Sequence, residues 1–235
     1  MGLNKNSIPT KPQFYGRRKG HTLRPHRQHL MKELLPKLIV PSDTNTPTDT
    51  ADLFDQASEV WMEIGFGAGE HLAAQAESHP EVGIIGCEPY INGVATLLSV
   101  IEKKSLKNIR IFNDDARLLL ENLAADSIAK VFVLFSDPWP KKRHNRRRFI
   151  NSETLNALAR IMKDRAEFRF ATDDMSYIRW ALDAFYHHPD FKWQVAGPTD
   201  WRERYPDAAA TRYETKALKQ GKKCVYLKFQ RVSRI

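Results

Sequence analysis

Two short segments of this 235-residue chain carry side chains whose types and spacing could support chemistry. The first, EIGFGAG at residues 63–69, places an acid before three glycines and follows an apolar run typical of a buried strand. The second, DPWPKKRHNRRR at residues 137–148, joins an acid and an aromatic residue to a dense cationic run. Both follow strand-like sequence. We therefore expect a chemical site at the end of a parallel sheet, next to a surface that binds a polyanion.

The glycine loop of the first segment indicates a cofactor that is not a dinucleotide. Gly65, Gly67 and Gly69 allow a tight turn and a close approach of the backbone to a ligand. A dinucleotide fingerprint has the spacing G-x-G-x-x-G, whereas this loop reads G-x-G-x-G and is followed by Glu70, which would repel a pyrophosphate. With Glu63 before the loop, a cationic ligand without phosphate fits better. S-adenosylmethionine is such a ligand.

Acidic residues at the ends of successive strands support the same prediction. Glu88 lies about 20 residues past the glycine loop, where an acid can accept hydrogen bonds from both ribose hydroxyls. Asp115 begins the helix after the third strand and could accept from the adenine amino group, although Asp114 is hard to separate from it. Asp137 ends the fourth strand, beside the expected reactive group of the cofactor. Helix capping or a solvated turn is the alternative for any one of these acids.

The second segment offers groups for a base and for phosphates. Asp137 and Trp139, the latter held between two prolines, could position a flat base, with a structural turn as the alternative. Lys141 could then meet a substrate phosphate or a base edge. The run that ends at Arg148 contains no acid, so its cations repel one another unless a polyanion binds. Arginine suits planar contacts to phosphate, but such a run does not separate RNA from DNA.

Two downstream segments carry further polar groups. Either Thr172 or Asp173, which end a strand-like run, could cap the next helix. Residues 211–214 supply a hydroxyl, a cation, an aromatic ring and an acid in turn, with a plain surface turn as the alternative. The histidines show no metal-ligand spacing with the two cysteines, so no metal site is predicted.

Composition and charge limit the classes of function. Lysine and arginine number 37 against 28 acids, a formal net charge of +9, which favours a polyanionic partner. Residues 1–40 are strongly basic, with Glu33 as their one acid. Cys87 and Cys224 lie in apolar runs and are expected to be buried free thiols in a reducing compartment. No apolar run approaches the length of a membrane span or forms the core of a signal peptide, so we expect a cytoplasmic protein without a membrane partner.

Strand-like and helix-like segments alternate from Val60 onward, which predicts a doubly wound α/β domain with a mostly parallel, seven-stranded, Rossmann-like sheet. A late antiparallel strand is plausible. Residues 1–50 are expected to form a basic, mobile arm and a linker, with a short helix at 26–35 ended by Pro36, and residues 51–235 the main domain. Expected strands lie at 60–64, 83–88, 109–113, 131–136, 167–171, 193–196 and 224–229. Expected helices lie at 69–78, 91–103, 115–124, 152–162 and 175–186.

Taken in order, these motifs resemble those of the bacterial tRNA (guanine-N7-)-methyltransferases, a family of class I S-adenosylmethionine-dependent methyltransferases. The resemblance covers residues 60–230, and the basic segment at 17–27 is also similar to the N-terminal segment of the family. DPWPKKRHNRR is highly specific, whereas the glycine loop is shared with most class I methyltransferases. The matching motifs are EIGFGAG at 63–69, EP at 88–89, DA at 115–116, DPWPK at 137–141, RHNRRR at 143–148, TD at 172–173 and TRYE at 211–214.

The resemblance implies transfer of the methyl group of S-adenosylmethionine to N7 of a guanine in the tRNA variable loop, with Asp137 as the catalytic position. It implies cofactor contacts by Glu63, Glu88, Asp115 and Asp137. The glycine loop adds Gly65, Gly67 and Gly69 to this set. It implies substrate contacts by Lys141, Arg143, His144, Asn145, Arg146, Arg147, Arg148, Asp173, Thr211, Arg212, Tyr213 and Glu214.

Three other interpretations stay open at this point. A class I methyltransferase could act on another RNA or on a small molecule, although the cationic run and the DPWPKKRHNRR match favour tRNA. An NAD-dependent oxidoreductase is disfavoured by the glycine spacing and by Glu70. A non-enzymatic RNA-binding protein would have no use for Glu63, Glu88 and Asp137 together. Oligomeric state, the set of tRNAs, the order of binding and which acid stabilises the guanine are not predicted.

Overall fold

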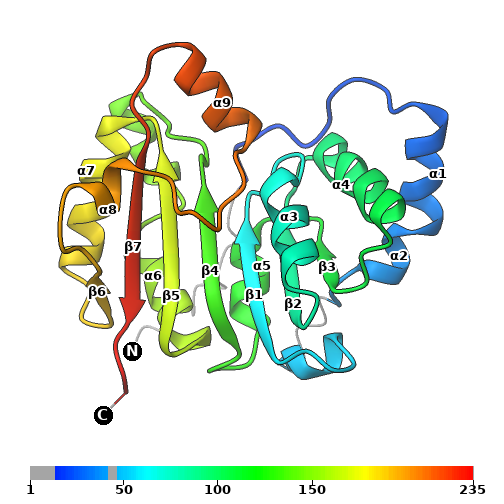
Figure 1. Ribbon diagram of the computed structural model, residues 1–235, viewed down its shortest axis with the longest axis horizontal. Coiled ribbons are helices and arrows are strands. Elements are labelled where there is room, and N and C mark those ends of the chain that lie inside the picture. Colours follow the sequence, from blue (N-terminus) through cyan, green and yellow to red (C-terminus); the bar gives the residue numbers. More distant parts are fainter. Residues whose placement is uncertain (1–13, 42–46, 235) are drawn as a thin grey trace, which may run out of the picture.

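A seven-stranded sheet with helices on both faces forms the body of the protein (Figure 1). The computed structural model describes residues 14–41 and 47–234. The strand order is β3-β2-β1-β4-β5-β7-β6; β7 runs antiparallel to both of its neighbours, and all other pairs are parallel. The strands are β1 (Glu59–Ile64), β2 (Val82–Cys87), β3 (Ile109–Phe112), β4 (Ile128–Leu134), β5 (Met162–Thr172), β6 (Phe191–Trp193) and β7 (Val225–Arg231).

The helices connect the strands and carry the two outer layers. They are α1 (Pro25–Glu33), α2 (Leu35–Leu38), α3 (Glu70–Ser78), α4 (Ile91–Lys104), α5 (Ala116–Asn122), α6 (Ser152–Ile161), α7 (Met175–Tyr186), α8 (Thr199–Arg202) and α9 (Arg212–Lys219), with 3-10 helices η1 (Thr50–Leu53) and η2 (Lys142–Arg147). Strand β1 shows how the layers arise. Met62 and Ile64 belong to the apolar core beneath α5, α6 and α7, whereas Trp61 belongs to the core beneath α3 and α4. This alternation follows from the two-residue period of a strand.

The doubly wound α/β fold and its late antiparallel strand are confirmed. The helix expected at 175–186 has those bounds, and both cysteines are buried and free. The bounds expected for the strand at 193–196 are wrong, because β6 covers Phe191–Trp193 and the pairing with β7 ends at the N–H of Gln194, 2.8 Å from the carbonyl oxygen of Lys228. Pro36 does not end the first helix. It lies in the first turn of α2, where its missing N–H breaks no helical hydrogen bond.

The basic N-terminal segment lies along α4 and the upper end of the sheet (Figure 1). The carbonyl of Arg18 accepts a hydrogen bond from the N–H of Ile91 (2.9 Å), and the Arg18 guanidinium pairs with Asp114 at 2.6 Å. Asn92 accepts from the N–H of Gly20 at 2.8 Å. Residues 14–24 are therefore held by the body of the protein. Residues 1–13 of the expected arm, and 42–46 of the expected linker, lie outside the described residues, and the division at residue 50 stays a prediction.

The first turn of α4 packs directly on the glycine loop. Gly65, Gly67 and Gly69 all have positive φ angles of 59–81°, as the predicted tight turn requires. A Cβ atom at Gly93 would lie 2.0 Å from the carbonyl oxygen of Gly67. Only a glycine at position 93 lets the helix approach the loop this closely.

We expect Gly93→Ala to displace the glycine loop and to lower the free energy of unfolding by about 1–3 kcal/mol, as overpacking in a buried site does. Urea unfolding checks the stability, and calorimetry with S-adenosylmethionine checks the loop. Gly197→Ala is the matched control, because a Cβ there meets no atom within 4 Å. Equal stability and cofactor affinity in the two variants would contradict this packing argument.

Candidate active site

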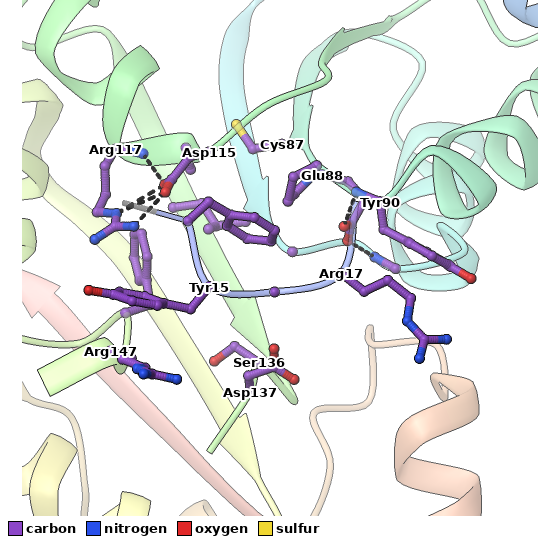
Figure 2. A pocket seen from close by; sticks show the side chains of 18 of the residues that line it. Tyr15, Arg17, Cys87, Glu88, Tyr90, Asp115, Arg117, Ser136, Asp137 and Arg147 are labelled. Atoms are coloured by element: carbon purple, nitrogen blue, oxygen red, sulfur yellow. Dashed lines mark hydrogen bonds and ion pairs between the residues drawn. The ribbon is translucent and has the colours of Figure 1, made fainter. Parts of the chain in front are cut away.

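A cavity of about 410 Å³ opens where the parallel strands end (Figure 2). Its floor comes from the ends of β1, β2 and β4, and its walls from the first turn of α5, from the N-terminal segment and from α9. The residues that line it are Phe14, Tyr15, Gly16, Arg17, Ile64, Gly65, Gly67, Cys87, Glu88, Pro89, Tyr90, Asp115, Ala116, Arg117, Phe135, Ser136, Asp137, Trp139, Arg147, Phe149 and Tyr213. The structure thus brings together the acids predicted at the ends of three different strands.

Glu88 joins the glycine loop to the start of α4. One carboxylate oxygen accepts from the N–H of Gly67 and the other from the N–H of Tyr90, both at 2.8 Å. Only 8% of Glu88 is exposed, and burial, with a smaller contribution from the nearby Asp137 and Glu63, raises its pKa to about 7. The carboxylate lines the cavity and keeps acceptor capacity for a ligand, as expected for a contact to ribose hydroxyls.

Asp115 is the helix cap that the sequence allowed, and its contact with the adenine amino group stays a prediction. It caps α5 by accepting from the N–H of Arg117 at 3.1 Å, and it also lines the cavity. The Arg117 guanidinium binds the same carboxylate through Nε and Nη2, at distances of 2.5–3.1 Å, as the dashed lines in Figure 2 show. A ligand amino group would share this acceptor with Arg117.

Asp137 stands at the mouth of the cavity, in the turn after β4. Among the described residues its carboxylate has no hydrogen-bond partner, and partial burial raises its pKa. The neighbouring Ser136 also lines the cavity. Phe135 and Trp139 have φ angles of 52° and 44°, a conformation that side chains other than glycine rarely adopt, so this turn is strained. Such strain is typical of functional sites.

Glu63 does not line the cavity. Its side chain points to the opposite face of β1 from Ile64, where one oxygen lies 2.7 Å from Nδ1 of His71 on α3. Both residues are almost fully buried, at 3% and 1% exposure. The pair fastens α3 to β1, and these two elements hold the ends of the glycine loop. A direct contact of Glu63 with the cofactor stays a prediction.

The cationic run folds as η2 and divides into exposed and buried members. Lys141, Lys142, Arg143 and Arg146 are exposed, and His144, Asn145 and Arg147 are half-buried. Arg148 is 2% exposed: its guanidinium donates to the carbonyls of Pro138 and Ser176 and to the Ser176 hydroxyl, at 2.6–3.2 Å. It fastens the loop to α7, and contact with RNA would require these bonds to break.

Residues 211–214 begin α9 and are split between the cavity and the interior. Thr211 caps the helix by accepting from the N–H of Glu214 at 3.1 Å. Glu214 is buried and accepts from the hydroxyl of Tyr226. Tyr213 is half exposed and lines the cavity, while Arg212 pairs with Glu70 at 2.8 Å. In this structure Tyr213 is therefore the member of the group that faces the cavity.

Asp173 follows β5, is not among the residues that line the cavity, and pairs with Lys222 at 2.5 Å. Neither Thr172 nor Asp173 caps α7 through its side chain. The cap is Asp174, which accepts from the N–H of Tyr177 at 2.8 Å. The choice between adjacent acids depends on the strand end, which sequence locates only to within a residue or two.

Some of the cavity could not be found from the sequence. The N-terminal segment supplies Phe14, Tyr15 and Arg17, and of these only Arg17 belongs to the basic segment that resembles the family. Tyr90 and Arg117 also line the cavity, each next to a predicted acid. A signal for Arg117 existed, because an arginine two residues after a helix cap can bind the capping carboxylate. Within residues 14–41 and 47–234, no group of His, Cys, Asp or Glu could hold a metal ion, and no helix could cross a membrane.

Comparison with known proteins decides the family. A family described as putative methyltransferases matches residues 56–227. Proteins named tRNA (guanine-N(7)-)-methyltransferase from Rhodospirillum rubrum and a Ruegeria species are 47% and 49% identical to the chain, covering 95% and 98% of it and 91% of each relative. The chain belongs to the bacterial tRNA (guanine-N7-)-methyltransferase family.

Solved structures agree with this family at the level of the fold. The 16S rRNA methyltransferase KamB superposes with a TM-score of 0.56 at 14% identity, over 83% of this chain and 98% of KamB. The antibiotic-resistance methyltransferase Kmr gives a TM-score of 0.54 at 15% identity, over 77% and 90%. At these identities the likeness concerns the sheet and its helices, and the tRNA (guanine-N7-)-methyltransferase family rests on the sequence relatives.

We expect cofactor affinity to depend on the ionisation of Glu88. If the Glu88 carboxylate accepts from two ribose hydroxyls as predicted, affinity should fall as the pH drops below 7, by up to about tenfold per pH unit. Above pH 7 the affinity should level off. Calorimetry with S-adenosylmethionine from pH 5.5 to pH 8.5 measures this. Glu88→Gln should bind more weakly at pH 8, by about 1.5–3 kcal/mol for each charge-assisted hydrogen bond lost, and should lack this pH step. An equal step in Glu88→Gln would assign it to another group.

Proposed function

We propose that the protein transfers the methyl group of S-adenosylmethionine to N7 of a guanine in the tRNA variable loop. The observation that carries this proposal is the junction of three acids, Glu88, Asp115 and Asp137, in one cavity beside the exposed cations of η2. The names of the curated relatives support the substrate and the atom. Such an enzyme would act in the cytoplasm, where Cys87 and Cys224 remain thiols.

The cavity residues fit S-adenosylmethionine. The positive φ angles of the glycine loop leave its backbone bare toward the cavity, and a Cβ at Gly65 would project into open space. Glu88 would hold the ribose hydroxyls, and Asp115, fixed by Arg117, would accept from the adenine amino group. Bound there, S-adenosylmethionine supplies a methyl group activated by its sulfonium charge. No phosphate is required, which suits a cavity with three acids in its walls.

The reaction requires placement more than proton transfer. Guanine N7 carries a lone pair in the ring plane and no proton at neutral pH, so no strong base is needed to activate it. The protein must set N7 in line with the methyl group and its leaving sulfur. Positive charge then develops on the guanine ring, and the Asp137 carboxylate at the cavity mouth can stabilise it. Partial burial disfavours the charged form of Asp137 and so raises its pKa. A cationic ring or a hydrogen-bond donor beside the carboxylate would stabilise the charged form.

Lys141 and the exposed cations of η2 would bind the tRNA backbone. Lys141, Lys142, Arg143 and Arg146 form no ion pair with any other residue that the structure describes, so their charges are free for phosphates. The basic N-terminal segment lies against the same cavity and extends this positive surface. A footprint of this kind gives strong, salt-sensitive binding.

We expect tRNA incubated with the enzyme and cofactor to be cleaved at one variable-loop guanosine by borohydride and aniline, the reaction diagnostic of N7-methylguanosine. Asp137→Ala should lower turnover far more than tRNA affinity, because its contact lies at the reacting centre. Asp183→Ala, at an exposed position on α7, is the control and should methylate normally. Methyl incorporation without cleavage would indicate another atom and overturn the proposed function.

The salt dependence of tRNA binding should separate the exposed from the buried arginine. Arg146→Ala should weaken binding and reduce the slope of log affinity against log salt by about 1, since one phosphate contact is lost. Arg148→Ala should instead lower thermal stability, because it leaves buried acceptors unpaired. Asp137→Ala should keep the wild-type slope. A slope that Arg146→Ala leaves unchanged would mean that this cation is only solvated.

A further inference from the structure

The guanidinium of Arg147 lies in a corner formed by two aromatic rings. Its central carbon is 4.2 Å from the ring centroid of Tyr15 and 4.9 Å from that of Trp139. The two rings meet edge to face, with centroids 6.3 Å apart and an interplanar angle of 77°. All three side chains line the cavity, and Figure 2 shows Arg147 beside Tyr15, on the side where Ser136 and Asp137 lie.

Within the part of the chain that the structure describes, the contacts recorded for the Arg147 guanidinium are those with these two rings. Its guanidinium makes no hydrogen bond or ion pair with any described residue, and its Nε atom is buried without a partner. The adjacent Arg148 shows the contrast, with hydrogen bonds to Pro138 and Ser176. Moving Arg147 out of the corner therefore breaks no hydrogen bond and relieves an unsatisfied N–H.

The two rings offer aromatic faces on which a target guanine could stack. A guanidinium is flat and cationic, and it is attracted to the negative faces of aromatic rings. A base is also flat, and RNA-modifying proteins commonly stack an unstacked base on aromatic side chains. A guanine methylated at N7 is in addition cationic. The rings that accept Arg147 would thus suit the base on entry and as product.

We propose that Tyr15 and Trp139 form the surface on which the target guanine stacks, and that Arg147 covers this surface in the free protein and leaves as the base enters. The proposal rests on the proposed function. Trp139 belongs to the strained turn that carries Asp137, so a base stacked there meets the catalytic carboxylate. The position of Tyr15 is fixed by its N-terminal segment, which is bound to α4 through the carbonyl of Arg18.

The displaced Arg147 then gains a phosphate. It ends η2, whose exposed members Lys142, Arg143 and Arg146 lie on the proposed tRNA surface. One side chain would serve two states: covering the rings before tRNA binds, and contacting the backbone afterwards. Entry of the base and closure of the protein on the tRNA backbone are therefore coupled.

The test measures single-turnover methylation of tRNA at saturating enzyme and cofactor, with cofactor and tRNA affinities measured separately. Tyr15→Ala should slow methylation roughly tenfold or more, the usual effect of losing one base–aromatic stack. Its cofactor affinity should stay within about twofold of wild type, since a lost stack spares the cofactor contacts. Tyr15→Phe keeps the ring and should restore the rate. Tyr186→Ala, whose ring is 86% exposed, is the control.

Other outcomes would overturn the proposal. A wild-type rate in Tyr15→Ala, or a rate in Tyr15→Phe as low as in Tyr15→Ala, would show that the ring does not stack on the base. Loss of cofactor affinity with an unchanged saturated rate would assign Tyr15 to the cofactor. Trp139→Leu tests the second ring independently and should show the same split between rate and affinity.

Arg147→Ala tests the displacement. Although the guanidinium is covered in the free protein, its removal should reduce the salt slope of tRNA binding by about 1. An unchanged slope would mean that Arg147 stays on the rings. A wild-type enzyme that forms no N7-methylguanosine would instead overturn the proposed function, and this inference with it, so the two failures are distinguishable.

Discussion

The carboxylate of Glu88 is the interaction on which the rest of the site depends. It binds the N–H of Gly67 on one side and that of Tyr90 on the other, and so fixes the glycine loop against the first turn of α4. A buried acid would be unfavourable here without these two donors. They satisfy part of the carboxylate and leave the remainder facing the cavity. The group that shapes the glycine loop is thus also the one that we propose as a ligand for the cofactor.

Much of the fold and part of the site follow from local pattern. Parallel strands bring their carboxyl ends to one edge of the sheet, so Glu88, Asp115 and Asp137 could be placed together without coordinates. The direction of a side chain at a strand end could not. The sequence pattern groups Glu63 with these acids, whereas the two-residue period of β1 turns its side chain toward His71 on α3.

The remainder depends on contacts between distant segments. Arg146 and Arg148 have the same side chain in the same run, but one is exposed and the other lies beneath the loop against Ser176. Sequence gives their charge, and only tertiary packing gives their burial. The same holds for Tyr15, whose position in the cavity wall is set by α4 and Trp139. Its segment looks polar and unstructured because its partners lie far along the chain.

The cavity wall joins the two ends of the described chain. Tyr15 contributes from near one end and Tyr213 from near the other, and the strands of the sheet lie between them in sequence. During synthesis the segment around Tyr15 leaves the ribosome before any of the elements on which it rests, and α9 is among the last to appear. Contacts of such long sequence separation form late and slowly. The binding site is therefore completed only near the end of folding, and until then a nascent chain has no closed cavity in which to hold the cofactor.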